Sequence, residues 1–197
     1  MAESIRLMKL KHAVITSVDR DDLKDQGANH WAETIRKVKE VNPETTLEVL
    51  IPAFQGKEEL IELVVAERPD IISHNLETVR RLTPEIRTRA KYDVSLKVLQ
   101  YIASRGIVAK TGIMLGLGET EQEVLELMDD ALAHDCRVLT IGQYMQPSRK
   151  HITVSEYIHP DKFKEYREIA LDKGFKHVES GPFVRSSYHA EKHVDTK

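Results

Sequence analysis

Short apolar runs alternate with amphipathic segments along the first three quarters of the chain. The apolar runs are rich in Val, Ile and Leu and are short enough to be buried parallel strands. They cover residues 12–18, 46–51, 70–74, 107–115 and 137–142. Apolar residues recur at helical spacing between them, in residues 30–41, 57–68, 93–104 and 121–133. This strand–helix alternation predicts an α/β fold with a parallel sheet or barrel.

The last quarter departs from this rhythm. A polar connection follows Gly142, then a helix over 161–173 and a final strand over 175–180. No internal repeat or Gly/Ser linker marks a second domain. We therefore expect a single domain over residues 1–197, with 143–197 as a C-terminal extension.

Composition narrows the class of protein. The chain is 41% hydrophobic and 31% charged, with a formal net charge of −3. This balance gives no basic field for nucleic acid. No apolar run approaches the roughly 18 residues that would cross a bilayer, and the N-terminus lacks a secretory pattern. We expect a cytoplasmic protein without nucleic-acid or membrane partners.

Cysteine occurs once, as Cys136 at the start of an apolar run. A single cysteine excludes an intrachain disulfide and any cysteine-only metal or iron–sulfur site within this sequence. Free cysteines are commonly buried as small hydrophobes, and we expect this one to be buried.

Polar clusters follow each predicted strand. They read "SVDRDD" (17–22), "PAFQG" (52–56), "HNLET" (74–78), "GLGET" (116–120) and "GQYMQPSRK" (142–150). In parallel architectures these loops meet at the carboxyl edge of the sheet, so we expect one mouth there. The alternative for each loop is a solvated tip.

Several polar residues in these clusters and beside them allow two interpretations. "GLGET" suits an anion cradle, or a plain turn followed by Thr120 and Glu123 as a helix cap. Lys110 lies in mid-strand, where lysine is costly unless it faces a cavity with a partner. His74 and Asn75 suit ligand binding or a turn cap. His134, His151 and His159 show no metal-ligand spacing.

Several longer stretches resemble lipoyl synthases of the radical S-adenosylmethionine (SAM) superfamily, in order and at natural spacing. They include "VITSVDRDDLKDQGANHWAETIRKVKEVNP", "HNLETVRRLTP", "KTGIMLGLGETEQEV", "LTIGQYMQPSRKH" and "GPFVRSSYHA". The resemblance implies a partial (β/α)6 barrel, a TIM-like fold, that inserts two sulfur atoms at carbons 6 and 8 of a protein-bound octanoyl chain. The implied cofactors are SAM and two [4Fe–4S] clusters. The implied partner is an octanoylated lipoyl carrier domain, of a dehydrogenase acyltransferase subunit or of the glycine cleavage H protein.

The resemblance also implies roles for individual residues. Ser17 and Asp19 would face the methionine amine of SAM, Asn75 and Glu77 the ribose or methionine, and Arg89 the carboxylate through its planar fork. Lys110 would lie within the mouth as a catalytic residue. In the "RSSY" motif, Ser187 or Ser186 would supply an oxygen ligand to the auxiliary cluster, and Ser187 is slightly favoured.

Two departures from the family pattern matter. Lipoyl synthases carry two cysteine triplets upstream of the segment where this chain starts, and neither is present. We therefore expect the first barrel strand and its cluster loop to be missing and the chain to be inactive alone. Ala53 stands where the family usually has an acidic residue, which puts a cofactor contact of that loop in doubt.

Two other functions remain open from the sequence. One is a non-catalytic module that binds the lipoyl carrier domain. The other is a cluster-free β/α-barrel lyase or isomerase, with "GLGET" holding a phosphate and Lys110 acting as base or Schiff-base nucleophile.

Overall fold

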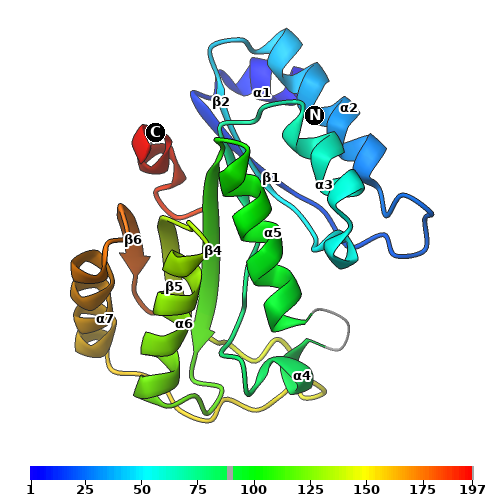
Figure 1. Ribbon diagram of the computed structural model, residues 1–197. Helices are drawn as coiled ribbons and strands as arrows, with labels where there is room; N and C mark the ends of the chain where they lie inside the picture. The colour runs from blue at the N-terminus through cyan, green and yellow to red at the C-terminus, as the bar shows by residue number, and fades with distance from the viewer. Residues whose placement is uncertain (88–90, 197) are drawn as a thin grey trace.

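A computed structural model describes residues 1–87 and 91–196. Six strands form one sheet in the order β1-β2-β3-β4-β5-β6, and every neighbouring pair is parallel (Figure 1). The strands are β1 (His12–Thr16), β2 (Thr46–Leu50), β3 (Ile71–Ser73), β4 (Val108–Leu115), β5 (Val138–Gln143) and β6 (His177–Ser180). Among the described residues β1 and β6 each pair with one strand only, so the sheet is an open, partial barrel. The expected fold class is confirmed.

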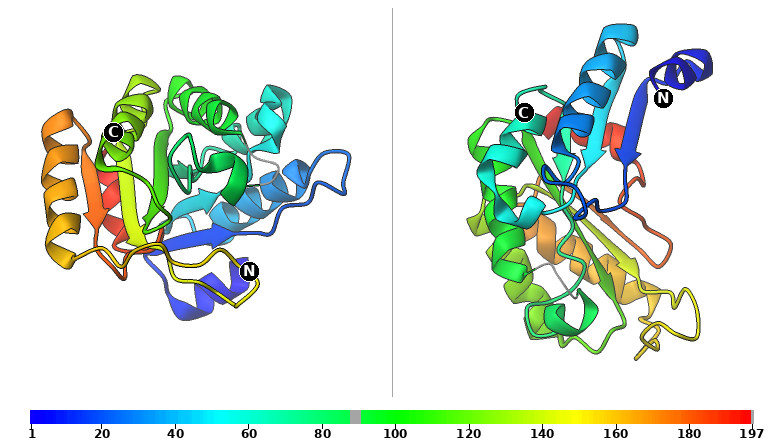
Figure 2. Two further views of the ribbon diagram at one scale, coloured as in Figure 1. Left: turned by 90° about the horizontal axis from the view of Figure 1, so that it is seen from below. Right: turned by 90° about the vertical axis from the view of Figure 1, so that its right-hand side faces the viewer.

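Helices connect successive strands. They are α1 (Ala2–Met8), α2 (Ala28–Val41), α3 (Glu58–Val65), α4 (Thr83–Ile86), α5 (Tyr92–Ser104), α6 (Glu121–Ala133) and α7 (Pro160–Lys173), with short 3-10 turns η1 (Phe54–Gly56) and η2 (Ala190–Thr196). Helices α2, α3, α5, α6 and α7 cover one face of the sheet, while η2 lies against the other (Figure 2).

The main core lies between the sheet and these helices. The stripe expected on α6 is buried there through Val124, Met128 and Ala131. Burial of a complete apolar side chain stabilises the fold by roughly 1.5–3 kcal/mol, which is why the helical spacing of these residues predicts the packing. No helix in the described part of the chain is long and apolar enough to cross a membrane.

The opposite, inner face of the sheet has a smaller apolar cluster. Ile71, Val108 and Val138 pack there against Val194 of η2. The C-terminal tail therefore covers part of the face that the helices leave free. Helix α4 and the turn η2 were not predicted from the sequence, because each is short and lacks a repeated apolar stripe.

Candidate active site

A cavity of about 610 Å³ opens where the first three strands end. Four residues predicted from the resemblance line it: Ser17, Asp19, Asn75 and Glu77. Segments that follow β1, β2 and β3 supply most of its walls, because parallel strands bring their carboxyl ends to one edge. The expected mouth therefore forms from these three loops, while the loops after β4 and β5 contribute no residue to this cavity.

Asn75 presents an acceptor that is free for a ligand. Its Nδ2 donates to Glu77 Oε1 at 3.1 Å, whereas its buried Oδ1 has no hydrogen-bond partner among the described residues. Gly112 of β4 makes space beside this oxygen: a Cβ at that position would lie 3.0 Å from Oδ1 and 2.6 Å from Thr140 Oγ1. A buried amide oxygen without a partner is costly, so the site favours a ligand that donates to it.

Glu77 is held by its backbone. Its φ is 66°, in the left-handed region, and it forms an isolated bridge with Ile113 of β4. The amide of Glu77 donates to the Gly112 carbonyl at 3.0 Å, and its own carbonyl accepts from Met114 at 2.9 Å. Burial raises the pKa of the Glu77 carboxyl, while Asn75 and Arg87 oppose that shift. The strand therefore fixes a carboxyl group at the cavity wall in a conformation that non-glycine residues seldom adopt.

A directed chain of hydrogen bonds runs behind Glu77. Arg87 Nη1 donates to Ser95 Oγ at 3.0 Å, and Ser95 Oγ lies 2.9 Å from His74 Nε2. His74 Nδ1 lies 3.0 Å from the Ile51 carbonyl, which can only accept, so Nδ1 carries the proton and Nε2 accepts from Ser95. Burial lowers the pKa of His74 to about 4, which keeps this ring neutral. The chain fixes the Arg87 guanidinium at the cavity.

Arg87 is a lining residue that sequence reasoning missed. Burial lowers its pKa, and the nearby carboxylates of Glu77 and Asp19 oppose that shift. The family resemblance predicts a guanidinium at the cavity from Arg89, which lies outside the described residues. Ser17 and Asp19 are exposed at the cavity mouth, and Ser17 Oγ donates to the Val18 carbonyl at 3.0 Å. Ala53 also lines the cavity and offers no side-chain acceptor.

The "GLGET" loop is a turn with a helix cap. Glu119 accepts from the amides of Gly116 and Leu117 at 2.6 and 2.9 Å. Thr120 and Glu123 form a reciprocal capping box on α6. Because the loop's own carboxylate takes these amides, the geometry favours the capping interpretation over an anion cradle.

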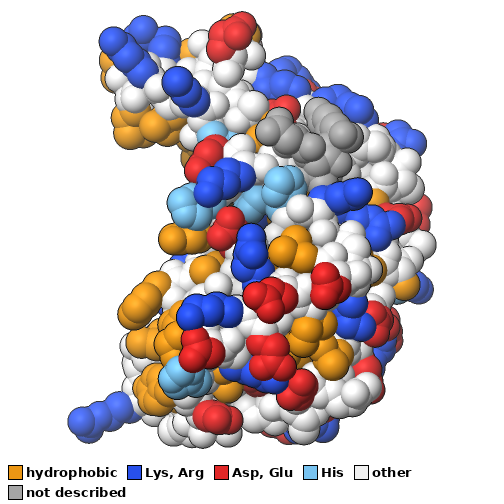
Figure 3. All heavy atoms as spheres, turned by 90° about the vertical axis from the view of Figure 1, so that its left-hand side faces the viewer, with side chains coloured by type: hydrophobic (Ala, Val, Ile, Leu, Met, Phe, Trp, Pro, Cys, Tyr) orange, Lys and Arg blue, Asp and Glu red, His pale blue; other side chains and the backbone are white. Residues whose placement is uncertain are grey.

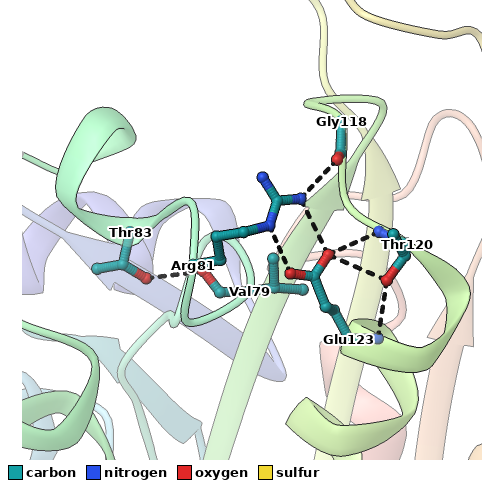
Figure 4. Close-up of polar contacts among 6 residues, drawn as sticks. All are labelled: Val79, Arg81, Thr83, Gly118, Thr120 and Glu123. Carbon is teal, nitrogen blue, oxygen red and sulfur yellow. Dashed lines mark hydrogen bonds and ion pairs between the residues drawn. The ribbon is translucent and has the colours of Figure 1, made fainter.

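Arg81 ties this cap to the segment after β3 (Figure 4). Its Nε donates to Glu123 Oε1 at 2.7 Å, and its Nη2 donates to Glu123 Oε2 at 3.0 Å and to the Gly118 carbonyl at 2.8 Å. Thr83 Oγ1 closes the preceding turn by donating to the Val79 carbonyl at 3.0 Å. Arg81 and Thr120 together lower the pKa of Glu123 to about 2.

Lys110 does not line the cavity. It is fully buried on the inner face of β4, where its Nζ lies 2.8 Å from Glu48 Oε1. Burial lowers the pKa of Lys110, and the Glu48 carboxylate opposes that shift. The partner expected for a mid-strand lysine is thus the buried Glu48 carboxylate. Lys110 was predicted to lie within the mouth as a catalytic residue, and it lies outside the cavity.

The "RSSY" motif lies in consecutive turns between β6 and η2. Ser186 is half-buried and Ser187 is exposed. The side of the molecule that faces left in Figure 1 mixes acidic, basic and hydrophobic side chains (Figure 3). The Ser186 carbonyl, rather than its hydroxyl, makes the inward contact, since it accepts from Lys110 Nζ at 2.5 Å.

The comparisons with known proteins agree with this architecture. A family model described as the radical SAM superfamily matches residues 1–131. A lipoyl synthase of Parabacteroides distasonis is 70% identical over 98% of this chain and 69% of its own length. Lipoyl synthases of Phocaeicola vulgatus and Treponema denticola are 66% and 61% identical, over 100% and 98% of this chain and 69% and 67% of their lengths. The chain belongs to the lipoyl synthase family.

Solved structures extend the likeness at the level of the fold. Methylornithine synthase (PylB) superposes with a TM-score of 0.68 at 12% identity, over 90% of this chain and 60% of that one. Streptococcus suis SuiB bound to S-adenosylmethionine gives 0.65 at 12% identity, over 91% of this chain and 42% of that one. At such identities the superpositions show only that the partial-barrel fold is shared.

Membership of the lipoyl synthase family implies SAM and iron–sulfur clusters as cofactors. The described residues fit SAM but not a complete cluster. The cavity offers polar groups and an open acceptor on Asn75, so its residues fit SAM. No group of three His, Cys, Asp or Glu side chains that could hold a metal occurs among the described residues. Cys136 is buried, as expected, and burial raises its pKa to about 12, so the thiolate that iron requires is disfavoured. A complete cluster does not fit the described residues alone.

Proposed function

We propose that this chain supplies the SAM-binding cavity and the RSSY tail of a lipoyl synthase. By family resemblance, that enzyme inserts two sulfur atoms at carbons 6 and 8 of an octanoyl group on a lipoyl carrier domain. The observation that supports this most is the cavity itself, which gathers Ser17, Asp19, Asn75 and Glu77 from two loops far apart in sequence. We infer a cytoplasmic location, and a dehydrogenase acyltransferase subunit or the glycine cleavage H protein as the source of the carrier domain.

The residues of the cavity have distinct tasks in this proposal. Bound SAM is the source of the 5′-deoxyadenosyl radical in the superfamily. Asp19 and Ser17 accept from its methionine amine, and Asn75 Oδ1 accepts from a ribose hydroxyl or from that amine. The Glu77 carboxyl faces the ribose or the methionine part of SAM as a further hydrogen-bond acceptor. Arg87 and Arg89 are the candidate guanidinium partners of the carboxylate.

Ser187, with Ser186 as the alternative, is proposed as the oxygen ligand of an auxiliary cluster whose other ligands this chain does not contain. Serine oxygen is a poorer match for iron than thiolate. In a longer chain that includes the cysteine triplets of the family, Ser187→Ala should abolish sulfur insertion while SAM cleavage continues, and Ser186→Ala should be milder. Full lipoyl formation by both variants would contradict the ligand assignment.

The geometry argues against a cluster-free lyase or isomerase. The amides of Gly116 and Leu117 donate to Glu119, and Lys110 is ion-paired inside the sheet rather than placed at the cavity. A phosphate site and a Schiff-base lysine would both require these groups to be free.

Calorimetric titration of the chain with SAM tests the cavity assignment. Replacing Asn75 by Ala removes the open acceptor, and we expect SAM to bind about tenfold more weakly, since a lost hydrogen bond in a buried site costs about 1–2 kcal/mol. Gln122→Ala, on the exposed surface of α6, is the control and should leave the affinity unchanged. Equal SAM affinity in all three proteins would refute the assignment.

A further inference from the structure

Lys110 belongs to a buried polar group on the inner face of the sheet. Its neighbours are Glu48 on β2 and Ser73 on β3, and all three are fully buried. Lys110 Nζ lies 2.8 Å from Glu48 Oε1 and 3.0 Å from Glu48 Oε2. Ser73 Oγ donates to Glu48 Oε1 at 2.5 Å. Three adjacent strands therefore contribute one side chain each to a connected network.

The third partner of the Lys110 ammonium comes from the C-terminal tail. Its Nζ also reaches the carbonyl of Ser186 at 2.5 Å, across 76 residues of sequence. An ammonium has three N–H donors, and the two carboxylate oxygens and this carbonyl are three acceptors. A buried ammonium with an unused donor is costly, so the network is complete only when the tail is in place.

The tail is guided to this position from both sides. Before the motif, Gln143 donates to the Pro182 carbonyl at 3.3 Å, and a Cβ on Gly142 would lie 2.4 Å from the Val184 carbonyl oxygen. After the motif, Val194 packs on the apolar cluster of the inner face. Lys110 stands between these two contacts and makes the only side-chain hydrogen bond to the peptide that joins Ser186 and Ser187 within the described residues.

We propose that Lys110 is a positioning residue, which holds the RSSY segment across the open face of the sheet by donating to the Ser186 carbonyl. The inference rests on the proposed function for the importance of the two serines, but the contact itself is independent of SAM and of any cluster. Glu48 acts through Lys110 by keeping the ammonium charged and oriented. Ser73 in turn orients Glu48.

Nuclear magnetic resonance reports on this contact directly. Ser-Ser occurs once in the chain, at residues 186 and 187. Protein labelled with carbonyl-13C serine and 15N serine therefore gives one amide–carbonyl correlation, which joins the Ser187 amide to the Ser186 carbonyl. Removal of a charged donor from that carbonyl moves this signal, whereas a change elsewhere in the fold leaves it in place.

The variants are Lys110→Met and the pair Lys110→Met with Glu48→Gln. The pair leaves no uncompensated buried charge and retains an acceptor for Ser73, so it preserves the fold if the single variant does not. Lys173→Met is the matched control, because Lys173 is ion-paired to Asp129 on the outer surface at 2.6 Å. Limited trypsin cleavage after the exposed Arg185 is the second readout.

We expect the Ser186 carbonyl signal to move in both Lys110 variants and to stay in place in Lys173→Met. Loss of a hydrogen bond from a charged donor should also raise the rate of cleavage after Arg185 by at least about tenfold. A folded double variant with an unmoved carbonyl signal and an unchanged cleavage rate would overturn the proposal. Neither the carbonyl signal nor the cleavage rate depends on SAM. A negative result here would therefore refute the role of Lys110 and leave the SAM assignment of the cavity untouched.

Discussion

Glu123 offers a quantitative test of how the edge of the sheet is held together. Replacing it by Gln removes the charge that Arg81 contacts through two nitrogens, at 2.7 and 3.0 Å, while an amide oxygen remains for the Thr120 amide. The Arg81 side chain is 55% exposed and that of Glu123 is 20% exposed, so solvent weakens the pair. A partly exposed ion pair contributes about 0.2–1 kcal/mol. A weakened capping box adds about 0.5–1 kcal/mol, and the free energy of unfolding should fall by about 1–2 kcal/mol at pH 7.

The same residue gives the effect a defined pH dependence. The folded-state pKa of Glu123 is lowered from 4.5 to about 2, so its stabilising contribution is complete above pH 4.5 and disappears as the pH falls through about 2. Urea unfolding of the two proteins should therefore show a difference that shrinks across this range. Glu126→Gln, an exposed change on the same helix, is the control and should stay within about 0.5 kcal/mol of the parent. A Glu123→Gln penalty equal at pH 7 and pH 2.5 would refute the ion-pair reasoning.

Three further expectations concern the cavity and the interior. Gly112→Ala places a Cβ 2.6 Å from Thr140 Oγ1 and 3.0 Å from Asn75 Oδ1, so SAM affinity measured by calorimetry should fall, and an unchanged affinity would contradict the role given to that space. Cys136, buried and with its pKa raised to about 12, should react with a thiol reagent at neutral pH only after denaturation, and rapid labelling of the native chain would count against this. Burial lowers the folded-state pKa of His74 from 6.5 to about 4. As the pH falls, the unfolded chain therefore binds a proton at His74 before the folded chain does. The free energy of unfolding should decline between pH 6.5 and pH 4, by at most about 1.4 kcal/mol per pH unit for this group. His74→Gln should flatten this part of the curve, and parallel curves for the two proteins would show that His74 is not responsible.

The repeating part of the fold was predictable because its pattern is local. The first five strands lie where Val, Ile and Leu concentrate, and the observed β4 (Val108–Leu115) falls within one residue of the predicted range at each end. The shorter α4 (Thr83–Ile86) carries no such signal, since four residues cannot show a helical period.

The site was predictable only in part. Asn75 and Glu77 were predicted for the cavity as polar residues that follow a strand, and they line it. Arg87 lies well after that strand and is held at the cavity by its hydrogen bond to Ser95, which in turn contacts His74. Lys110 was singled out as a costly mid-strand lysine. Its partner was detectable by the same criterion, because Glu48 is a carboxylate within the apolar run "TLEVLI". Its contact with the Ser186 carbonyl was not, because the acceptor is a backbone atom 76 residues away and has no side-chain signature.

The distance along the chain between Lys110 and Ser186 has a consequence for synthesis. At about 5–20 residues per second, a ribosome needs roughly 4–15 s to make the intervening 76 residues. During that interval β2, β3 and β4 can already pair, but the third donor of the ammonium must be satisfied by water. Until the tail arrives, Glu48, Ser73 and Lys110 thus form a hydrated polar strip on the inner face of the sheet. This strip opposes hydrophobic association of that face with other nascent chains. Docking of the tail then replaces the water at Lys110.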